Sequence, residues 1–209
     1  MVPTAFYVAI VGYIVGSLPT AYIAGRLAGI DIRRSGSGNV GATNVARVLG
    51  KRFGYPVFVV DVLKGFAAVE FAEVISASAH SSALVVDFWG IVGAIFAVIG
   101  HSYPVWLGFK GGKGVATSVG ALFALNWIPA LIVGIVWIVV FLTTRYVSLA
   151  SIVAAIALPV TVAAMFFSGN LLSPVLLYFS LFLAAIIVFH HRLNISRLLN
   201  GTEHRFVRK

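Results

Sequence analysis

Two glycine-rich polar segments interrupt a chain that is otherwise strongly apolar, and both lie where hydrophobic stretches end. The first reads Gly36-Ser-Gly-Asn-Val-Gly-Ala-Thr-Asn44, and the second reads Phe109-Lys-Gly-Gly-Lys-Gly114. Glycines expose backbone N–H groups and allow a ligand to approach closely, while neighbouring lysines and arginines add positive charge. Segments with these properties are suited to binding a phosphate group.

In the first segment, polar side chains alternate with glycines that permit close backbone approach, namely Gly36, Gly38 and Gly41. The side chains that supply hydroxyls and amides are Ser37, Asn39, Thr43 and Asn44. Arg47 follows, and its planar guanidinium can hold a phosphate through two hydrogen bonds. The alternative is a flexible loop with arginines that only orient the neighbouring spans. The alternation of asparagine and glycine favours a binding segment over such a linker.

In the second segment, Lys110 and Lys113 flank Gly111 and Gly112 just before a new apolar stretch. A helix that begins there would favour an anion through its free N–H groups and its dipole. The segment is not a nucleotide P-loop, since that motif needs Ser or Thr where Gly114 stands. The alternative is a membrane-reentry loop whose lysines extend to the surface.

The C-terminal tail is a third polar segment. His191 and Asn194, three residues apart, would share one face of a helix and could act as a pair. An interfacial amphipathic helix that binds anionic lipid, with Leu198 apolar and Arg197 basic, is the alternative.

The composition shows what must position these segments. The 209 residues are 60% hydrophobic and only 10% charged, against about 25% charged in soluble domains. We therefore predict an integral membrane protein. The net charge of +9 is dispersed among apolar stretches, which favours anionic lipids or an anionic substrate over nucleic acid. The absence of cysteine excludes disulfides and thiolate metal sites, and we expect neither a metal nor a cofactor.

The apolar stretches define the expected membrane spans, each of which needs about 20 residues. They run over 2–25, 53–75, 83–107, 115–144, 147–167 and 174–189. The fourth would reach about 45 Å as one helix, with Asn126 and Pro129 near its middle. It is either one tilted helix or two short ones.

The distribution of lysine and arginine decides between these alternatives. With seven spans, every Lys and Arg except Lys64 falls on one side of the membrane. We therefore predict an all-α polytopic protein of seven transmembrane helices, with its N-terminus outside and its C-terminus in the cytoplasm. Both glycine-rich segments and the tail then lie at the cytoplasmic face. No internal repeat and no soluble domain are evident, so residues 1–209 are expected to form a single domain.

Asp61 and Lys64 fall inside the second span, where isolated charges are costly. Their i, i+3 spacing predicts that they pair. Both a functional and a purely structural role are open.

Four motifs carry a family resemblance. They are Gly-Ser-Gly-Asn-Val-Gly-Ala-Thr-Asn-Val-x-Arg at 36–47, Asp-Val-Leu-Lys-Gly at 61–65, Gly-His-Ser-Tyr-Pro…Phe-Lys-Gly-Gly-Lys-Gly-Val-Ala-Thr at 100–117, and Asn-Ile-x-Arg-Leu-Leu-x-Gly-x-Glu at 194–203. Together they resemble the bacterial membrane-embedded acyl-phosphate:glycerol-3-phosphate acyltransferases, the PlsY family. The resemblance covers essentially the whole chain.

The resemblance implies transfer of a fatty acyl group from acyl phosphate to the sn-1 hydroxyl of glycerol 3-phosphate. The products are lysophosphatidic acid and inorganic phosphate, and the site faces the cytoplasm at the bacterial inner membrane, in contact with membrane lipids. Carried over by motif, the catalytic residues are Ser37, Arg47, Lys113 and His191. The substrate-binding residues are Gly38, Asn39, Thr43, Asn44, His101, Lys110, Gly111, Gly112, Asn194 and Glu203. Leu193 stands where the family often has glutamate.

Acyl phosphate is a mixed anhydride with a good leaving group, so positioning and charge neutralisation can suffice without an acyl-enzyme. The general base is either His191 or the phosphate of the donor. No aspartate stands five residues after any histidine, so the His-x-x-x-x-Asp motif of acyl-CoA-dependent enzymes is absent. A transporter for an organic phosphate and a scaffold without catalysis are the rival functions.

Overall fold

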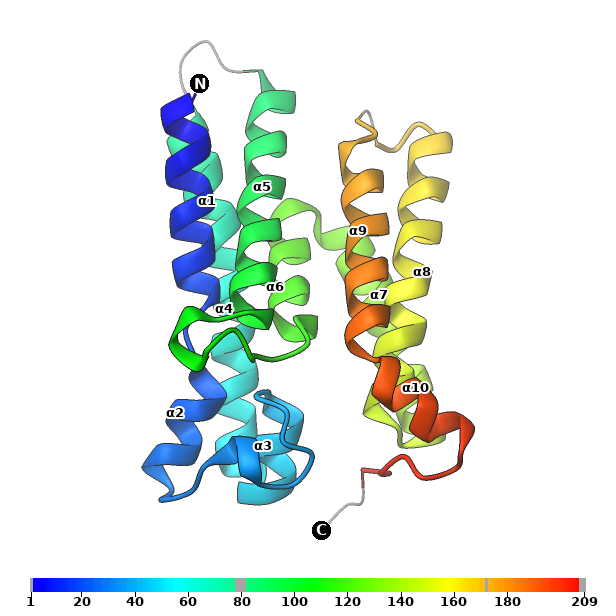
Figure 1. The fold of residues 1–209 in the computed structure, drawn as a ribbon. Helices are drawn as coiled ribbons and strands as arrows, with labels where there is room; N and C mark the ends of the chain where they lie inside the picture. The colour runs from blue at the N-terminus through cyan, green and yellow to red at the C-terminus, as the bar shows by residue number, and fades with distance from the viewer. Residues whose placement is uncertain (1, 78–81, 172, 207–209) are drawn as a thin grey trace. The chain divides into compact units, whose positions relative to one another are not determined.

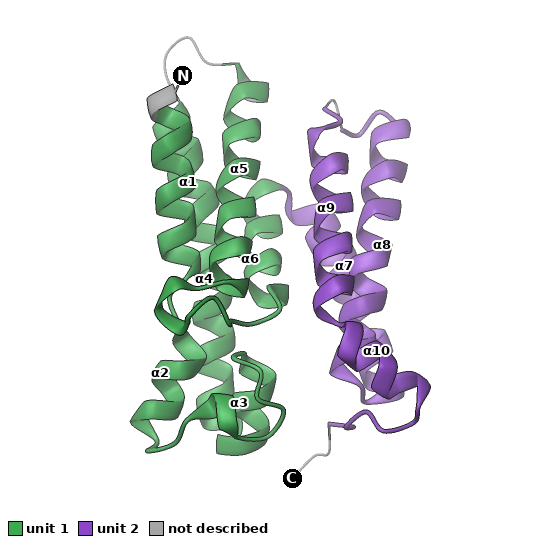
Figure 2. Ribbon diagram, viewed as in Figure 1, with its two compact units in different colours: residues 1–125 green, residues 126–209 purple. Residues whose placement is uncertain are grey.

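The computed structural model describes residues 2–77, 82–171 and 173–206, and all of the regular structure in these ranges is helical (Figure 1). This confirms the expected all-α class. The chain divides into two compact units, Met1–Leu125 and Asn126–Lys209 (Figure 2).

The first unit is built around one long central helix. Its helices are α1 (Val2–Gly16), α2 (Thr20–Leu27), α3 (Ala42–Leu49), α4 (Lys51–Ser76), α5 (Ala83–Ser102) and α6 (Val115–Leu125), with short 3₁₀ turns η1 (Ile32–Arg34) and η2 (Val105–Leu107). The central helix α4 packs against α1, α3, α5 and α6, and α1 also packs against α5 (Figure 1). The two glycine-rich segments are the connections that lead into α3 and α6.

Small residues let α4 and α6 pack backbone to backbone. A Cβ added at Gly65 would overlap the carbonyl oxygen of Thr117, and one added at Gly120 would overlap that of Val62. Close approach through small residues is the usual way to pack helices that lack a hydrophobic driving force between them. The start of α6, and with it the end of the second glycine-rich segment, is thereby fixed against α4.

A small apolar core joins the two glycine-rich segments to this framework. It consists of Ala21, Ile32, Val40, Val45, Val57 and Leu107, all buried. Val40 belongs to the first segment, and Leu107 lies in η2 just before the second. Both loops are therefore anchored by burying apolar side chains among the same neighbours.

The expected first span is broken. It was expected over residues 2–25, and within it α1 ends at Gly16 and α2 begins at Thr20. Pro19 has no backbone N–H and cannot continue the hydrogen-bonding pattern of α1. Thr4–Leu27 as a whole nevertheless keeps the length and hydropathy of a membrane span, as expected.

The second unit contains α7 (Trp127–Thr144), α8 (Val147–Phe167), α9 (Val175–His190) and the short α10 (Arg192–Leu199). In this unit α8 packs against both α7 and α9, and α10 contacts α8 and α9. The side chain of Asn126 caps α7 by accepting a hydrogen bond from the N–H of Ile128 at 3.1 Å. The 115–144 stretch is thus two helices separated at Asn126, which was one of the two expected possibilities.

Several helices have the length and composition to cross a membrane. In the described ranges these are Thr4–Leu27, Leu84–Leu107, Trp127–Thr144 and Val147–Phe167, with a fifth if α9 and α10, bent by 59°, count as one span. The 26-residue α4 carries Asp61 and Lys64 in its interior, and α6 has only 11 residues. Seven spans and the orientation of the termini stay predictions.

Candidate active site

The side chain of Asn44 organises the first glycine-rich segment. Asn44 is only 1% exposed. Its Nδ2 donates to the carbonyl oxygens of Ser35 at 3.0 Å and Ile32 at 3.2 Å, and its Oδ1 accepts from the N–H of Ser37 at 2.9 Å. These bonds engage both ends of the amide, so Asn44 shapes the loop in this structure rather than presenting its amide to a ligand.

Glycine is needed on both sides of Ser37. Gly36 and Gly38 have φ of +61° and +71°, in the left-handed region that other residues rarely adopt. A Cβ at Gly36 would also overlap the Oδ1 of Asn44. The resulting turn leaves Ser37 exposed, while Asn39 and Thr43 are half-buried.

Arg47 extends from the exposed face of α3, one turn after Asn44. Among the described residues, no hydrogen bond or ion pair engages its guanidinium. A cation in this position is available to an anionic ligand, whereas Arg33 is held by Asp31 at 2.7 Å. That ion pair and its hydrogen bonds lower the pKa of Asp31 to about 2.

The backbone of the second glycine-rich segment is hydrogen-bonded to the end of α5. The N–H groups of Gly111 and Gly112 donate to the carbonyl oxygens of Ser102 at 3.0 Å and His101 at 3.1 Å. Both N–H groups are thus bonded within the protein, and the anion-binding role expected of this backbone stays a prediction. The small size of these glycines also matters, since a Cβ at Gly112 would overlap the Nε2 of His101.

The structure brings the two segments together. A Cβ at Gly112 would lie 2.8 Å from the carbonyl oxygen of Val40, so the backbones of the two loops are in contact at this point. Lys113 follows immediately and is half-buried, and Lys110 is exposed. Gly114, with φ of +81°, then turns the chain into α6. The loop that carries Lys113 is therefore a direct neighbour of the loop that carries Ser37.

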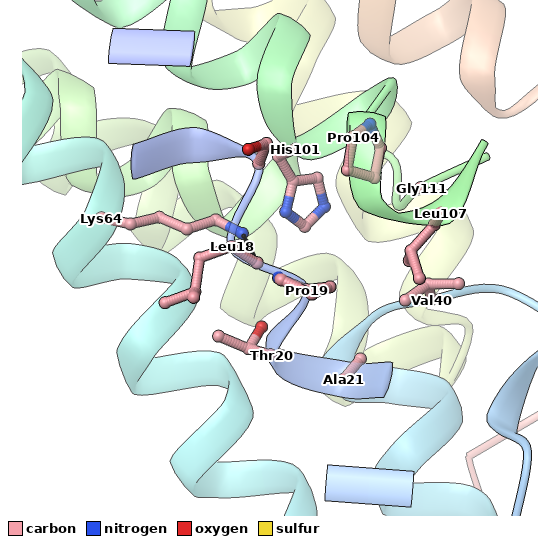
Figure 3. A pocket seen from close by; sticks show the side chains of 11 residues that line it. Leu18, Pro19, Thr20, Ala21, Val40, Lys64, His101, Pro104, Leu107 and Gly111 are labelled. Atoms are coloured by element: carbon pink, nitrogen blue, oxygen red, sulfur yellow. Dashed lines mark hydrogen bonds between the residues drawn. The ribbon is translucent and has the colours of Figure 1, made fainter. Parts of the chain in front are cut away.

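Lys64, Thr20 and His101, which line a small cavity in Figure 3, belong to a buried polar network centred on Asp61. Asp61 and Lys64 form the expected pair at 2.8 Å, and the Nζ of Lys64 also donates to the carbonyl oxygen of Leu18 at 3.2 Å. Thr20 donates its hydroxyl to Asp61 at 2.6 Å. The Nδ1 of His101 lies 3.7 Å from the same Asp61 oxygen. A cavity of about 10 Å³, at the lower limit of what can hold one water molecule, adjoins Lys64 and His101.

In the second unit, Glu203 gathers the polar side chains of the tail. Its Oε1 accepts from Ser148 and Asn194, each at 2.7 Å, and its Oε2 accepts from Arg197 at 2.8 Å. Burial acts to raise the pKa of Glu203, but the hydrogen bonds from Arg197, Ser148 and Asn194 outweigh it, so the pKa is lowered. Ser148 was missed by sequence reasoning, because a single serine in an apolar span carries no signal.

His191 lies at the bend between α9 and α10 and is 3% exposed. Its Nδ1 is 2.8 Å from the carbonyl oxygen of Ile187. Because a carbonyl can only accept, Nδ1 carries the proton, and Nε2 bears the lone pair of the neutral ring. This tautomer suits a general base. Asn194 is already engaged by Glu203, and the convergence of this tail with the loops of the first unit stays a prediction.

The alternative of an interfacial tail helix has some support in the geometry. In α10, Leu193 and Leu199 are 65% and 82% exposed, which is suited to a lipid surface. Within the described ranges, no group of three His, Asp or Glu side chains is placed to hold a metal ion.

Comparison with known proteins identifies the family. The sequence profile described as glycerol-3-phosphate acyltransferase matches residues 6–201. Proteins named glycerol-3-phosphate acyltransferase from Aquifex aeolicus and Gloeobacter violaceus are 44% and 46% identical over 203 residues each. The alignments cover 97% and 96% of this chain and 99% and 94% of the relatives.

Two crystal structures are similar over most of the chain. Both are of PlsY, described as an integral membrane glycerol 3-phosphate acyltransferase, in a glycerol 3-phosphate form and a lysophosphatidic acid form. Their TM-scores are 0.84 and 0.83 at 43% and 42% identity, with 97% of this chain and 96% and 95% of those chains covered. The chain is an integral membrane protein and belongs to the glycerol-3-phosphate acyltransferase family typified by PlsY.

Proposed function

We propose that this protein transfers a fatty acyl group from acyl phosphate to the sn-1 hydroxyl of glycerol 3-phosphate. The products are 1-acylglycerol 3-phosphate and inorganic phosphate. The observation that carries the proposal is the contact between the two glycine-rich loops at Val40 and Gly112, since it makes the Ser37 loop and the Lys113 loop neighbours. The PlsY structures, in forms with glycerol 3-phosphate and lysophosphatidic acid, support the same chemistry.

Both proposed substrates are phosphates, and they repel each other as they approach. Arg47 and Lys113 offset this repulsion, and Ser37 adds a hydroxyl that can hydrogen-bond to a phosphate oxygen. In the reaction, the sn-1 oxygen attacks the acyl carbon, the bond from that carbon to the phosphate oxygen breaks, and phosphate leaves. Since phosphate is a good leaving group, orientation and charge neutralisation account for catalysis without a covalent enzyme intermediate.

A base must take the proton of the attacking hydroxyl. His191 is one candidate, because the carbonyl oxygen of Ile187 fixes the proton on Nδ1 and leaves Nε2 able to accept one. The phosphate of the donor is the other candidate. A pH profile of kcat that loses its acidic limb in His191→Gln would assign the role to His191.

We further propose that residues 1–209 work as one catalytic domain in the bacterial inner membrane, with seven spans and the site facing the cytoplasm. The distribution of lysine and arginine supports this orientation. To test this orientation, a cysteine is introduced at position 38 or in the 168–171 connection. Each cysteine is then labelled from the outer and from the inner side of the membrane. Labelling of position 38 from outside would contradict the proposal.

The reaction is tested with purified protein, labelled glycerol 3-phosphate and acyl phosphate. We expect a lipid product, and no product when acyl-CoA replaces acyl phosphate. Ser37→Ala and Lys113→Ala should lower kcat/KM at least about 100-fold while the protein stays folded in detergent. Uptake of glycerol 3-phosphate into vesicles without lipid product would indicate a transporter, and neither result would indicate a scaffold.

A further inference from the structure

The buried charges of α4 need an explanation that the reaction alone does not supply. Asp61 and Lys64 are 1% and 5% exposed, in the interior of a helix packed on several sides. A buried ion pair contributes little net stability, because desolvation of both charges cancels much of their attraction. The pair is therefore better explained by what it holds in place.

One carboxylate oxygen of Asp61 joins three segments of the first unit. It accepts a hydrogen bond from Thr20 at the start of α2, pairs with Lys64 in α4, and lies 3.7 Å from the Nδ1 of His101 in α5. Lys64 extends the network to the carbonyl oxygen of Leu18 in the break between α1 and α2. The network thus links α2, α4 and the break between α1 and α2, and the end of α5 lies against it.

The imidazole of His101 lies between this network and the second glycine-rich segment. Its Nδ1 faces Asp61, and its Nε2 faces Gly112, where only a glycine leaves room for it. The backbone of His101 also accepts the N–H of Gly112 at 3.1 Å. Lys113 is the next residue. A planar, rigid ring therefore separates the carboxylate from the segment that carries the proposed catalytic lysine.

We propose that Asp61 is a positioning residue, which acts through the ring of His101 and the backbone of Gly112 to hold Lys113 where acyl transfer requires it. The proposal rests on the proposed function above. Asp61 is too deeply buried to touch a substrate, so its effect reaches the reaction only through the loop. Displacement of a catalytic group by about 1 Å can cost about 100-fold in rate, which sets the scale of the expected effect.

The test uses Asp61→Asn together with Lys64→Met. The single variant leaves Lys64 buried without its counter-charge and is exposed to misfolding. The double variant removes both charges at similar volume. We expect it to unfold near the wild-type temperature in detergent but to lose about 10- to 100-fold in kcat/KM for glycerol 3-phosphate. Ser180→Ala, which removes a buried hydroxyl in α9, is the matched control and should retain full activity.

Coupling to Lys113 separates positioning from a general structural effect. In a Lys113→Ala background, removal of the Asp61 and Lys64 charges should cost less than about 3-fold, because the group that they position is gone. The proposal would be overturned if the activity losses of Lys113→Ala and of the Asp61→Asn, Lys64→Met variant simply multiply when combined. Full activity of the Asp61→Asn, Lys64→Met variant would overturn it as well. An inactive wild-type protein would instead refute the proposed function, so the two failures are distinguishable.

Discussion

Gly112→Ala is the most direct probe of the contact between the two glycine-rich loops. The added Cβ would overlap the Nε2 of His101 and lie 2.8 Å from the carbonyl oxygen of Val40, whereas ordinary contact begins at 3.4 Å. Relief of the Val40 contact alone needs a shift of about 0.6 Å, and relief of the His101 overlap needs more. The segment that carries Lys113 must therefore move away from the loop that carries Ser37.

We expect a loss of about 100-fold in kcat/KM for glycerol 3-phosphate from this displacement, and a loss of about 1–3 kcal/mol in the free energy of unfolding from overpacking. Acyl transfer is measured at saturating acyl phosphate, and stability is measured by thermal unfolding in detergent. Gly134→Ala in α7 is the matched control, because its Cβ would meet no atom within 4 Å. Wild-type turnover by Gly112→Ala would refute the reasoning that the loop contact sets the geometry of the site.

Three further predictions concern groups that hold the loops and the tail. Asn44→Ala leaves the N–H of Ser37 without its partner and should lower the free energy of unfolding by about 1–3 kcal/mol and raise KM for glycerol 3-phosphate, measured by thermal unfolding and steady-state kinetics. Glu203→Gln should be less stable than wild type above about pH 4.5. Because the folded-state pKa of Glu203 is lowered, this difference in stability should shrink as pH falls below that value. A difference in stability that widens on acidification would contradict this. Gly120→Ala should force α6 away from Val62 and lower the unfolding temperature, and an unchanged temperature would show that these helices can separate without cost.

The helix breaks show how far sequence reasoning reaches. The break at Asn126 was one of two predicted alternatives, because an asparagine and a nearby proline interrupt a stretch too long for one span. The break before Pro19 was missed. A single serine and proline hardly change the composition of an apolar run, so hydropathy alone cannot separate a broken helix from a continuous one.

Some contacts of the site could be predicted from the sequence and others could not. The pair of Asp61 and Lys64 was predictable, since residues three apart on a helix are neighbours. The approach of His101 to Asp61 was not, because it depends on how α5 packs against α4. At Gly111 and Gly112 the backbone is closely approached by the end of α5. The sequence could not tell whether a ligand or the protein's own chain makes that approach.

The way the loops are held bears on how the site works. The amide of Asn44 and the backbone of His101 hold the two loops through hydrogen bonds within the protein. The geometry of the loops is thus set before substrate arrives, and preorganised groups cost no reorganisation during reaction. The residues that supply positive charge to the site are therefore different from those that fix the shape of the loops. Loss of a cation such as Arg47, which none of the described residues engages, should weaken catalysis without lowering stability, whereas substitution of Gly112 should impair both.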